Sequence, residues 1–373
     1  MKSVFTTLFL ILLSASILMN DTFSQSFYTG KVGVNLSIYG RVRIFSDSLT
    51  TRQIDRSSLL VASAPDAVFD YKKDAEAIDT SMTVLNPLLS DFELYGSIDN
   101  SYDSLFAPPN VLAKINVYGW NNVGGVVVKF TILNREPGSI NGIVGMEIIP
   151  QPDGSYGLET IEYISSAQVV SLYRLPSSKI TGYKILSAPV TTVNTIDWYE
   201  DYSLIDDSLY NWMTTGTLEP LFDAGGDGPV TFFSQNAVPI NSGDSAVVFV
   251  GISVGADQTE MLANMDDVVT KYNQLTSVES DFNNIPSDFV LEQNYPNPFN
   301  PSTKISFGLP QRSNIVLKVF NTLGEEVAEL VNESLEAGTH SYNFDASNLT
   351  SGIYIYSLQT EAGVISKKMT LVK

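Results

Sequence analysis

The residues best suited to chemistry lie in one acidic and aromatic segment, DWYEDYSLIDDSLYNW, which spans residues 197–212. Aromatic faces can stack on sugar rings while neighbouring carboxylates accept hydrogen bonds from hydroxyl groups. We therefore predict Trp198, Tyr202 and Trp212 as glycan contacts. The alternative is that these rings plug the edge of the fold, because large aromatic side chains are more often buried than presented to a ligand.

The acids of this segment leave one class of enzyme open. Glycoside hydrolysis needs paired Asp or Glu residues and neither His nor Cys. The segment offers five such acids, which are Asp197, Glu200, Asp201, Asp206 and Asp207. Sequence spacing does not fix the separation of about 5 to 9.5 Å that the mechanism needs, and an acidic surface turn explains the same residues. We predict no catalytic residues and favour a protein that is not an enzyme.

A glycine-rich stretch, DAGGDGP at residues 223–229, could surround a calcium ion with oxygen ligands. Asp223 and Asp227 would supply the carboxylates. The spacing does not match an EF-hand, and an ordinary turn has the same composition. We expect no cofactor, with calcium as the one alternative.

The composition excludes several classes of protein. The chain has 373 residues, 41 acids, 21 bases, one histidine and no cysteine, which gives a net charge of −20. Without cysteine there is no disulfide, thiolate metal site or thiol nucleophile, and His340 alone cannot build a zinc site or a catalytic triad. The acidic balance argues against nucleic acid, whose binding depends on clustered Lys and Arg.

Most of the chain has the pattern of β-strands, rich in Val, Ile, Thr and Tyr. Apolar residues alternate in Lys31–Phe45 and Val111–Tyr118, and we expect Gly124–Asn134, Gly142–Pro150 and Gly157–Ile164 to form a meander with a turn at Asp153–Gly154. Further strands are expected at Val169–Arg174, Gly182–Leu186, Val230–Phe233 and Ser245–Val254. The fold class is all-β, and residues 25–275, called the passenger below, are expected to form a large antiparallel β-sandwich. Two smaller sandwiches are the alternative.

Three segments delimit the passenger. The uncharged run Val4–Met19 and the small residues Thr22 and Ser24 are typical of a signal peptide over residues 1–24, although the alternative is an uncleaved anchor. Residues 257–275 have a capping box and helical spacing, and residues 276–287 have the composition of a linker. Nine acids and six bases follow Asn284, so residues 25–284 carry a charge of −17.

The last segment, residues 288–373, is predicted to be a small immunoglobulin-like β-sandwich. Prolines at 296, 298 and 301 enforce an extended start. Six strand-like runs follow, with glycines at their junctions; the runs are Lys304–Leu309, Ile315–Asn321, Glu325–Leu330, His340–Phe344, Ile353–Gln359 and Val364–Val372.

Five motifs in this segment occur in order, namely Asn294–Pro301, Phe320–Val327, Glu336–His340, Leu349–Tyr356 and Lys367–Lys373. With these motifs the segment closely resembles the type A C-terminal sorting domain of the type IX secretion system. The resemblance implies that the passenger passes through the periplasm and is then carried across the outer membrane by the secretion machinery, to be released or attached to surface lipopolysaccharide. The residues that it implies for sorting are Tyr295, Pro296, Asn297, Pro298, Phe299, Asn300, Pro301, Gly324, Gly338, Gly352, Tyr354, Lys367, Lys368 and Lys373. Gly352 and the lysines could equally serve a turn and an edge strand.

The sequence therefore predicts a secreted or surface-displayed protein whose passenger binds, adheres or belongs to the envelope without catalysing a reaction. The alternative is a glycan-binding module or a carboxylate-dependent glycoside hydrolase. Extracellular glycans are the expected ligands in that case.

Overall fold

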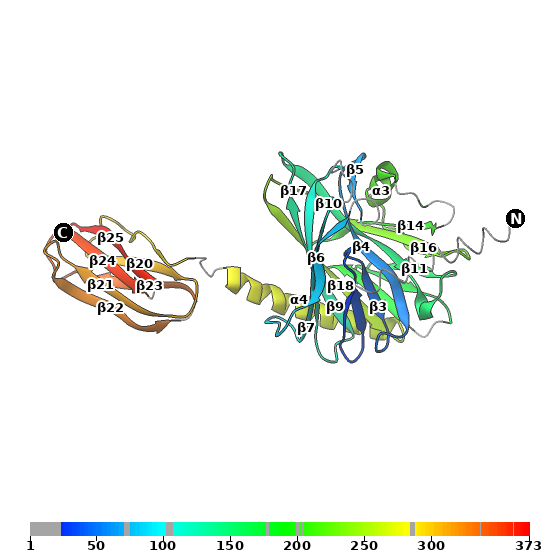
Figure 1. Ribbon diagram of the computed structural model, residues 1–373, viewed down its shortest axis with the longest axis horizontal. Helices are drawn as coiled ribbons and strands as arrows, with labels where there is room; N and C mark the ends of the chain where they lie inside the picture. Colours follow the sequence, from blue (N-terminus) through cyan, green and yellow to red (C-terminus); the bar gives the residue numbers. More distant parts are fainter. Residues whose placement is uncertain are drawn as a thin grey trace. The chain divides into compact units, whose positions relative to one another are not determined.

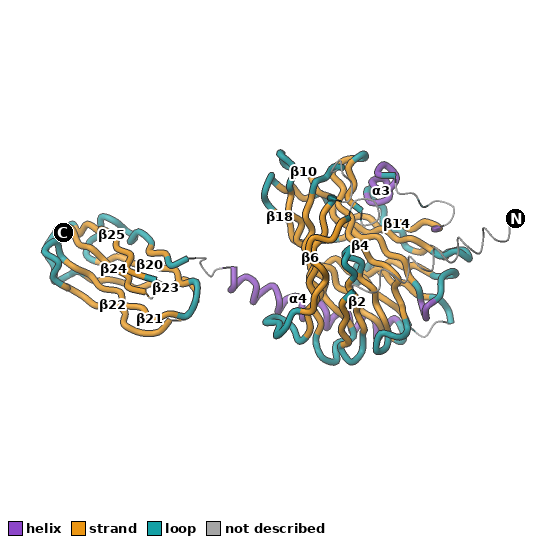
Figure 2. Tube along the Cα trace, in the orientation of Figure 1, coloured by secondary structure: helices purple, strands orange, loops and turns teal. Residues whose placement is uncertain are grey.

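The computed structural model describes most of the chain after the predicted signal peptide, which lies outside the described residues except for Ser24. The described residues are 24–70, 75–101, 107–176, 179–198, 202, 205–283, 288–335, 337–360 and 362–373. They form two compact units that divide between Leu275 and Thr276. Strands dominate both units, which confirms the all-β sandwich fold (Figures 1 and 2).

The passenger contains two antiparallel sheets. The first sheet follows the order β1-β2-β3-β4-β10-β16-β14, with β5 paired to β4 and β17 paired to β10. Its strands are β1 (Gln25–Tyr28), β2 (Gly33–Leu36), β3 (Val42–Phe45), β4 (Arg52–Ala64), β5 (Ala67–Phe69), β10 (Ile140–Pro150), β14 (Val190–Asp197), β16 (Pro229–Gln235) and β17 (Val238–Ile240).

The second sheet follows the order β15-β11-β12-β13-β18-β9-β8-β7-β6. Its strands are β6 (Glu76–Thr83), β7 (Phe92–Asp99), β8 (Val111–Gly119), β9 (Gly125–Asn134), β11 (Thr160–Ile164), β12 (Val169–Tyr173), β13 (Ile180–Ile185), β15 (Leu221–Asp223) and β18 (Ser245–Gly255).

The core lies between the two sheets and is built from alternate residues of their strands. In β9, for example, Val126, Val128, Phe130 and Ile132 are fully buried in it. From the first sheet, β10 contributes Val144, Met146 and Ile148 to the same core. Each such side chain contributes about 1.5 to 3 kcal/mol through burial, so no disulfide is needed to hold the sheets together.

The prediction that the three strands of residues 124–164 form one meander is wrong. β9 and β11 belong to the second sheet, whereas β10 lies in the first sheet between β4 and β16. Asp153 and Gly154 do adopt the positive φ angles of a turn, 52° and 78°, but this turn connects the two sheets. Alternation of apolar residues identifies a strand but not the sheet that it joins.

The single strand expected at Lys31–Phe45 is divided into β2 and β3. Ser37 and Arg41 close the turn between them through the hydrogen bond from Ser37 N to Arg41 O, 2.9 Å long. Gly40 lies in this turn with a φ of 74°, a conformation that glycine adopts without strain. The long strand β4, which follows β3, was not expected from the sequence.

Two α-helices of the described residues pack on the passenger. α4 (Gln258–Asn283) covers the outer face of the second sheet, where Met261, Met265 and Val268 contact Val127 and Phe249 (Figure 1). It extends past the expected end at Leu275 through most of the segment whose composition indicated a linker. The short helix α3 (Asp206–Met213) packs against β5, β14 and β16. No helix among the described residues is long and apolar enough to cross a membrane.

The C-terminal unit is a small sandwich of a three-stranded and a four-stranded sheet, with orders β19-β20-β23 and β22-β21-β24-β25. Its six long strands fall where the six strand-like runs predict them. The six long strands are β20 (Ser302–Leu309), β21 (Ser313–Phe320), β22 (Glu326–Leu335), β23 (Gly338–Asp345), β24 (Gly352–Thr360) and β25 (Gly363–Leu371), and the short strand β19 (Val290–Leu291) precedes them.

Candidate functional site

The three aromatic residues predicted as glycan contacts lie together in one stacked row. The ring centroids of Trp198 and Tyr202 are 5.5 Å apart, and those of Tyr202 and Trp212 are 6.3 Å apart. Trp212 also stacks on the buried ring of Phe232, at 5.1 Å. Tyr202 and Trp212 therefore use both of their ring faces for contacts within the protein, which favours a packing role for these two rings.

The row is fixed to the first sheet through a buried ion pair. Arg56 on β4 pairs with Glu147 on β10, and both side chains are at most 3% exposed. The hydroxyl of Tyr202 donates a 2.9 Å hydrogen bond to the second carboxylate oxygen of Glu147. The Arg56 guanidinium lies 5.4 Å from the ring centroid of Trp198. Burial, and then the Glu147 charge, raise the pKa of Tyr202, so its hydroxyl remains a donor.

The described acids of the same segment accept hydrogen bonds from backbone groups or from a side chain of α3. Asp197 accepts a 3.2 Å hydrogen bond from Gly225 N, and Asp206 accepts one of 3.2 Å from Val68 N. Asp207 accepts a hydrogen bond of 3.4 Å from the Asn211 side chain, one turn along α3. The other two acids of the segment, Glu200 and Asp201, lie outside the described residues.

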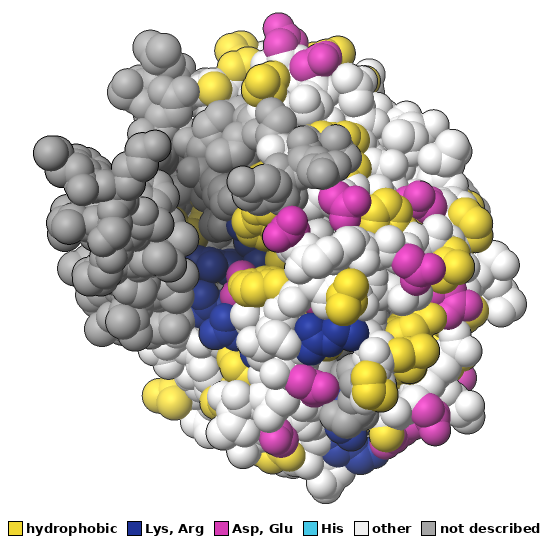
Figure 3. Space-filling view, turned by 90° about the vertical axis from the view of Figure 1, so that its right-hand side faces the viewer, with side chains coloured by type: hydrophobic (Ala, Val, Ile, Leu, Met, Phe, Trp, Pro, Cys, Tyr) yellow, Lys and Arg dark blue, Asp and Glu magenta, His cyan; other side chains and the backbone are white. Residues whose placement is uncertain are grey.

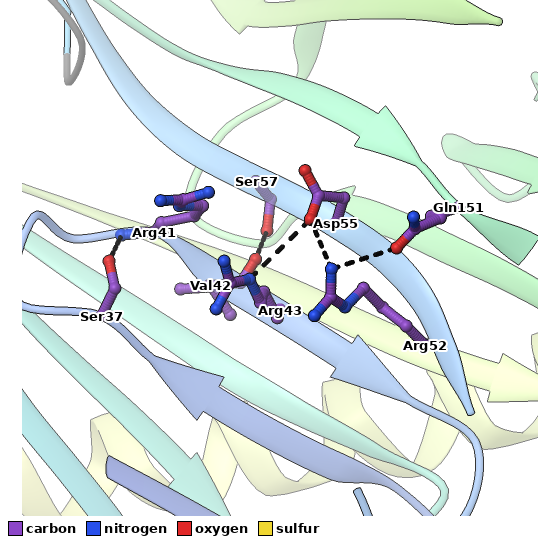
Figure 4. A network of polar contacts seen from close by, with 8 residues as sticks. All are labelled: Ser37, Arg41, Val42, Arg43, Arg52, Asp55, Ser57 and Gln151. Carbon is purple, nitrogen blue, oxygen red and sulfur yellow. Dashed lines mark hydrogen bonds and ion pairs between the residues drawn. The ribbon is translucent and has the colours of Figure 1, made fainter. Parts of the chain in front are cut away.

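A second group of polar residues lies on β3, on β4 and at the residue directly before β3, and we call it the arginine face. It consists of Arg41, Arg43, Arg52, Asp55 and Arg56. Register shifts along β3 and β4 interrupt the alternation of faces, so that Arg43, Arg52 and Asp55 meet on one side of the sheet (Figure 4). Figure 3 shows several basic side chains on the face of the molecule that it displays.

Asp55 is shared by two arginines at this face. Its Oδ1 accepts a hydrogen bond of 2.8 Å from Nη1 of Arg52 and lies 3.9 Å from Nε of Arg43 (Figure 4). The Gln151 side chain accepts a second hydrogen bond, 3.1 Å long, from the same Nη1. Arg43 is almost fully buried, whereas the side chain of Arg52 is 25% exposed.

Tyr156 borders the arginine face and is 48% exposed. Burial of its hydroxyl, together with the neighbouring Asp55 carboxylate, raises the pKa of Tyr156 to about 12. The hydroxyl is therefore neutral at any physiological pH. The exposed ring and the accessible part of Arg52 form the accessible edge of the arginine face.

Of the two aspartates proposed for calcium, Asp223 is the last residue of β15 and Asp227 lies in the turn before β16. Asp223 accepts a hydrogen bond of 2.7 Å from the hydroxyl of Thr160, across the β11–β15 pair. Both aspartates are exposed. Among the residues that the structure describes, no group of three or more His, Cys, Asp or Glu side chains could hold a metal ion.

The residues implied for sorting lie partly in the core and partly on the surface of the C-terminal unit. Phe299 and Tyr354 are buried in its core, and Tyr295 is 80% exposed. Asn297 accepts a hydrogen bond of 2.9 Å from Thr370 N, which ties the start of the unit to β25. Lys373 donates one of 2.6 Å from Nζ to Ser347 O.

The glycines of the sorting motifs differ in whether the backbone conformation requires glycine at their position. Gly324 and Gly338 have positive φ angles, 83° and 135°, which L side chains rarely adopt. Gly352, at the start of β24, has no such angle, and a Cβ added there would meet only Thr350 O, at 4.0 Å. Neither strain nor crowding requires glycine at position 352.

Sequence reasoning missed the arginine face, although a signal for it exists. Four of the seven arginines of this acidic chain lie between residues 41 and 56. Such a concentration of guanidinium groups in a segment of strands is unusual within residues 25–284, which carry a net charge of −17. The register shifts that bring the side chains together cannot be seen from alternation.

The family model of the secretion system C-terminal sorting domain matches residues 293–372. This segment of the chain is a type IX secretion tail and directs the protein to secretion or to the outer cell surface. No curated protein matches the chain.

Three solved structures are similar to larger parts of the chain. A bacterial glucoamylase in complex with acarbose has a TM-score of 0.49 and 11% identity, over 70% of this chain and 36% of its own. A polysaccharide lyase has a TM-score of 0.34 and 7% identity, over 94% of this chain and 46% of its own. A galactose mutarotase-like protein from Lactobacillus casei has a TM-score of 0.37 and 8% identity, over 62% of this chain and 100% of its own. The chain thus spans less than half the length of the first two proteins.

Proposed function

We propose that the protein is an exported glycan-binding protein without catalytic activity, and that the accessible edge of the arginine face is its binding site. The observation that carries the proposal is the exposed ring of Tyr156 beside the hydrogen-bonding side chains of Arg52, Asp55 and Gln151. Sugar recognition combines these two elements, an aromatic surface for the ring and polar groups for the hydroxyls.

The placement of the helices supports this site. α4 covers the outer face of the second sheet, and α3 packs at the end of the first sheet that holds β14 and β16. Neither α3 nor α4 packs closely against β3 of the first sheet. Arg43 and Arg56 are buried, so the part of this face that is accessible to a ligand is the edge formed by Tyr156 and Arg52.

The rigidity of the site also supports binding. Arg52 is held through two acceptors on one nitrogen, and Asp55 is held between two arginines. Side chains already fixed by such contacts lose little conformational freedom when a ligand arrives. The described acids of residues 197–207 are occupied with backbone groups and α3, which supports binding rather than hydrolysis.

A glycan array tests the proposal. The mature chain from Gln25 onwards should bind at least one class of glycan, and Tyr156→Ala should abolish or strongly weaken that signal because the exposed ring is lost. Tyr295→Ala is the matched control, since Tyr295 is an exposed tyrosine of the other unit. Absence of binding to every glycan, or equal binding by Tyr156→Ala and the intact chain, would contradict the proposal.

For export, we infer that the C-terminal unit contacts the outer-membrane secretion machinery and that the passenger is afterwards released or attached to lipopolysaccharide. Deletion of residues 353–373 removes most of β24 and all of β25, with the buried side chains of Tyr356, Leu358 and Met369. The passenger should then accumulate in the periplasm, as measured by cell fractionation. Surface levels equal to those of the intact chain would contradict the inference.

A further inference from the structure

We infer that the glycan bound at the arginine face carries an acidic group, either the carboxylate of a uronic acid or a sulfate ester, and that Arg52 binds this group. The inference rests on the proposed function and specifies its ligand. It follows from how the donors of one guanidinium group are used.

The contacts of Arg52 are confined to one of its nitrogens. Nη1 donates to Asp55 and to Gln151, at 2.8 and 3.1 Å. Nε is buried and has no hydrogen-bond partner, and Nη2 donates no hydrogen bond to any residue that the structure describes. Nε and Nη2 form one edge of the guanidinium group, and this edge can donate two parallel hydrogen bonds to a carboxylate or a sulfate.

A buried donor without an acceptor destabilises the folded protein, so the state of Nε calls for an explanation. An acidic group that enters beside the partly exposed guanidinium would supply acceptors to both nitrogens of this edge. A neutral sugar hydroxyl would supply a single and weaker acceptor. The unsatisfied edge therefore favours an oxyanion.

The neighbours of Arg52 hold the guanidinium group in a fixed orientation without accepting hydrogen bonds from this edge, of which Nε is shielded from solvent. Asp55 and Gln151 both attach to Nη1, and the ring centroid of Phe45 lies 5.8 Å from the Arg52 guanidinium carbon. Asp55 itself is shared with Arg43, so its negative charge is partly balanced by a second cation. Tyr156 is neutral beside this group and does not repel an anion.

Calorimetric titration of the mature chain tests the inference with three probes at one ionic strength. The probes are oligogalacturonides for carboxylates, short dextran sulfates for sulfate esters, and malto-oligosaccharides as neutral sugars. The intact chain should bind at least one acidic probe, and Arg52→Gln should weaken that binding by about ten- to a hundredfold, the range for charge-assisted hydrogen bonds. Whichever acidic probe depends on Arg52 identifies the source of the oxyanion.

Two further variants keep the result interpretable. Arg135→Gln is the matched control, because Arg135 is another partly exposed arginine in an ion pair, with Asp99, and lies outside the arginine face. Arg52→Lys keeps the positive charge but cannot offer two parallel donors, so it should lose most of the affinity even if Arg52→Gln folds poorly. Retention of acidic-glycan affinity within about twofold in both Arg52 variants would overturn the inference.

The failure of this inference can be distinguished from failure of the proposed function. Binding of neutral but not acidic glycans, weakened by Tyr156→Ala, would refute the acidic ligand and leave the proposed function intact. Absence of binding to any glycan would refute both.

Discussion

Replacement of Glu147 by glutamine tests whether the Arg56–Glu147 pair is a buried charge pair that holds the aromatic row on the first sheet. Both side chains are at most 3% exposed, so the substitution leaves the Arg56 charge without its carboxylate in a buried position. Breaking a buried pair in this way costs about 3 to 5 kcal/mol, and we expect the lower end because the amide oxygen can still accept from Tyr202. For a domain of this size, about 3 kcal/mol lowers the melting temperature by roughly 6 to 12 °C.

Tryptophan fluorescence is the appropriate assay because the three tryptophans, Trp120, Trp198 and Trp212, all lie in the passenger. Thermal unfolding of the mature chain followed by this signal reports the passenger and not the C-terminal unit. Arg135→Gln is the control: it removes the partly exposed partner of its pair while Asp99 keeps the hydrogen bonds from Ser101, so the cost should be clearly smaller than that of Glu147→Gln.

The reasoning also predicts a rescue. The double variant Arg56→Met/Glu147→Leu removes both charges and should recover most of the lost stability, since an apolar pair avoids the cost of a lone buried ion. If Glu147→Gln lowers the melting temperature no more than the Arg135→Gln control does, the assignment of the pair as a buried structural interaction is wrong.

Three further outcomes are expected. Burial raises the pKa of Glu159 above its ordinary value of 4.5, so the folded passenger retains a proton that the unfolded chain releases. The stability of the passenger should therefore fall as the pH rises from 4.5 through the folded pKa. Thermal melts at several pH values should show that Glu159→Gln removes this part of the pH dependence, and an equal pH dependence of both chains would contradict the raised pKa. Gly352→Ala should leave the stability of the C-terminal unit unchanged but reduce surface display if this glycine serves recognition. Gly338→Ala should instead lower the free energy of unfolding by about 1 to 3 kcal/mol through backbone strain. Normal surface display of Gly352→Ala would show that Gly352 is dispensable for sorting. A calcium chelator should leave the passenger melting temperature unchanged, because Asp223 is satisfied by Thr160; a clear decrease would instead indicate a bound ion.

The C-terminal unit could be predicted from its sequence almost strand by strand. Its runs alternate regularly, as in β21, where Ile315, Leu317 and Val319 are buried and the residues between them are not. Its turns carry glycines such as Gly324 and Gly338 at positive φ angles. Both signals are local, so they remain visible without knowledge of the partner strand.

For the passenger, the sequence predicted the all-β fold class but not the arrangement of the strands. β4 is long and buried but contains Arg52, Asp55 and Arg56, and its register shifts against β3 and β10 disturb the alternation that marks a strand. The helix α3 was missed because it is only two turns long. The arginine face depends on these register shifts, which result from long-range pairing and leave no local pattern in the sequence.

The exchange of strands between the two sheets sets an order of folding events for a chain that is synthesised from its N-terminus. β4 can pair with β10 only after about ninety further residues have been added to the chain. The second sheet is continuous only once β18 has paired with both β13 and β9. Such distant pairings make folding slow compared with that of a chain of local hairpins. The C-terminal unit emerges later still, so the sorting signal becomes complete only after every strand of the passenger has been delivered. Every strand of the passenger is therefore available for pairing before the secretion tail is complete.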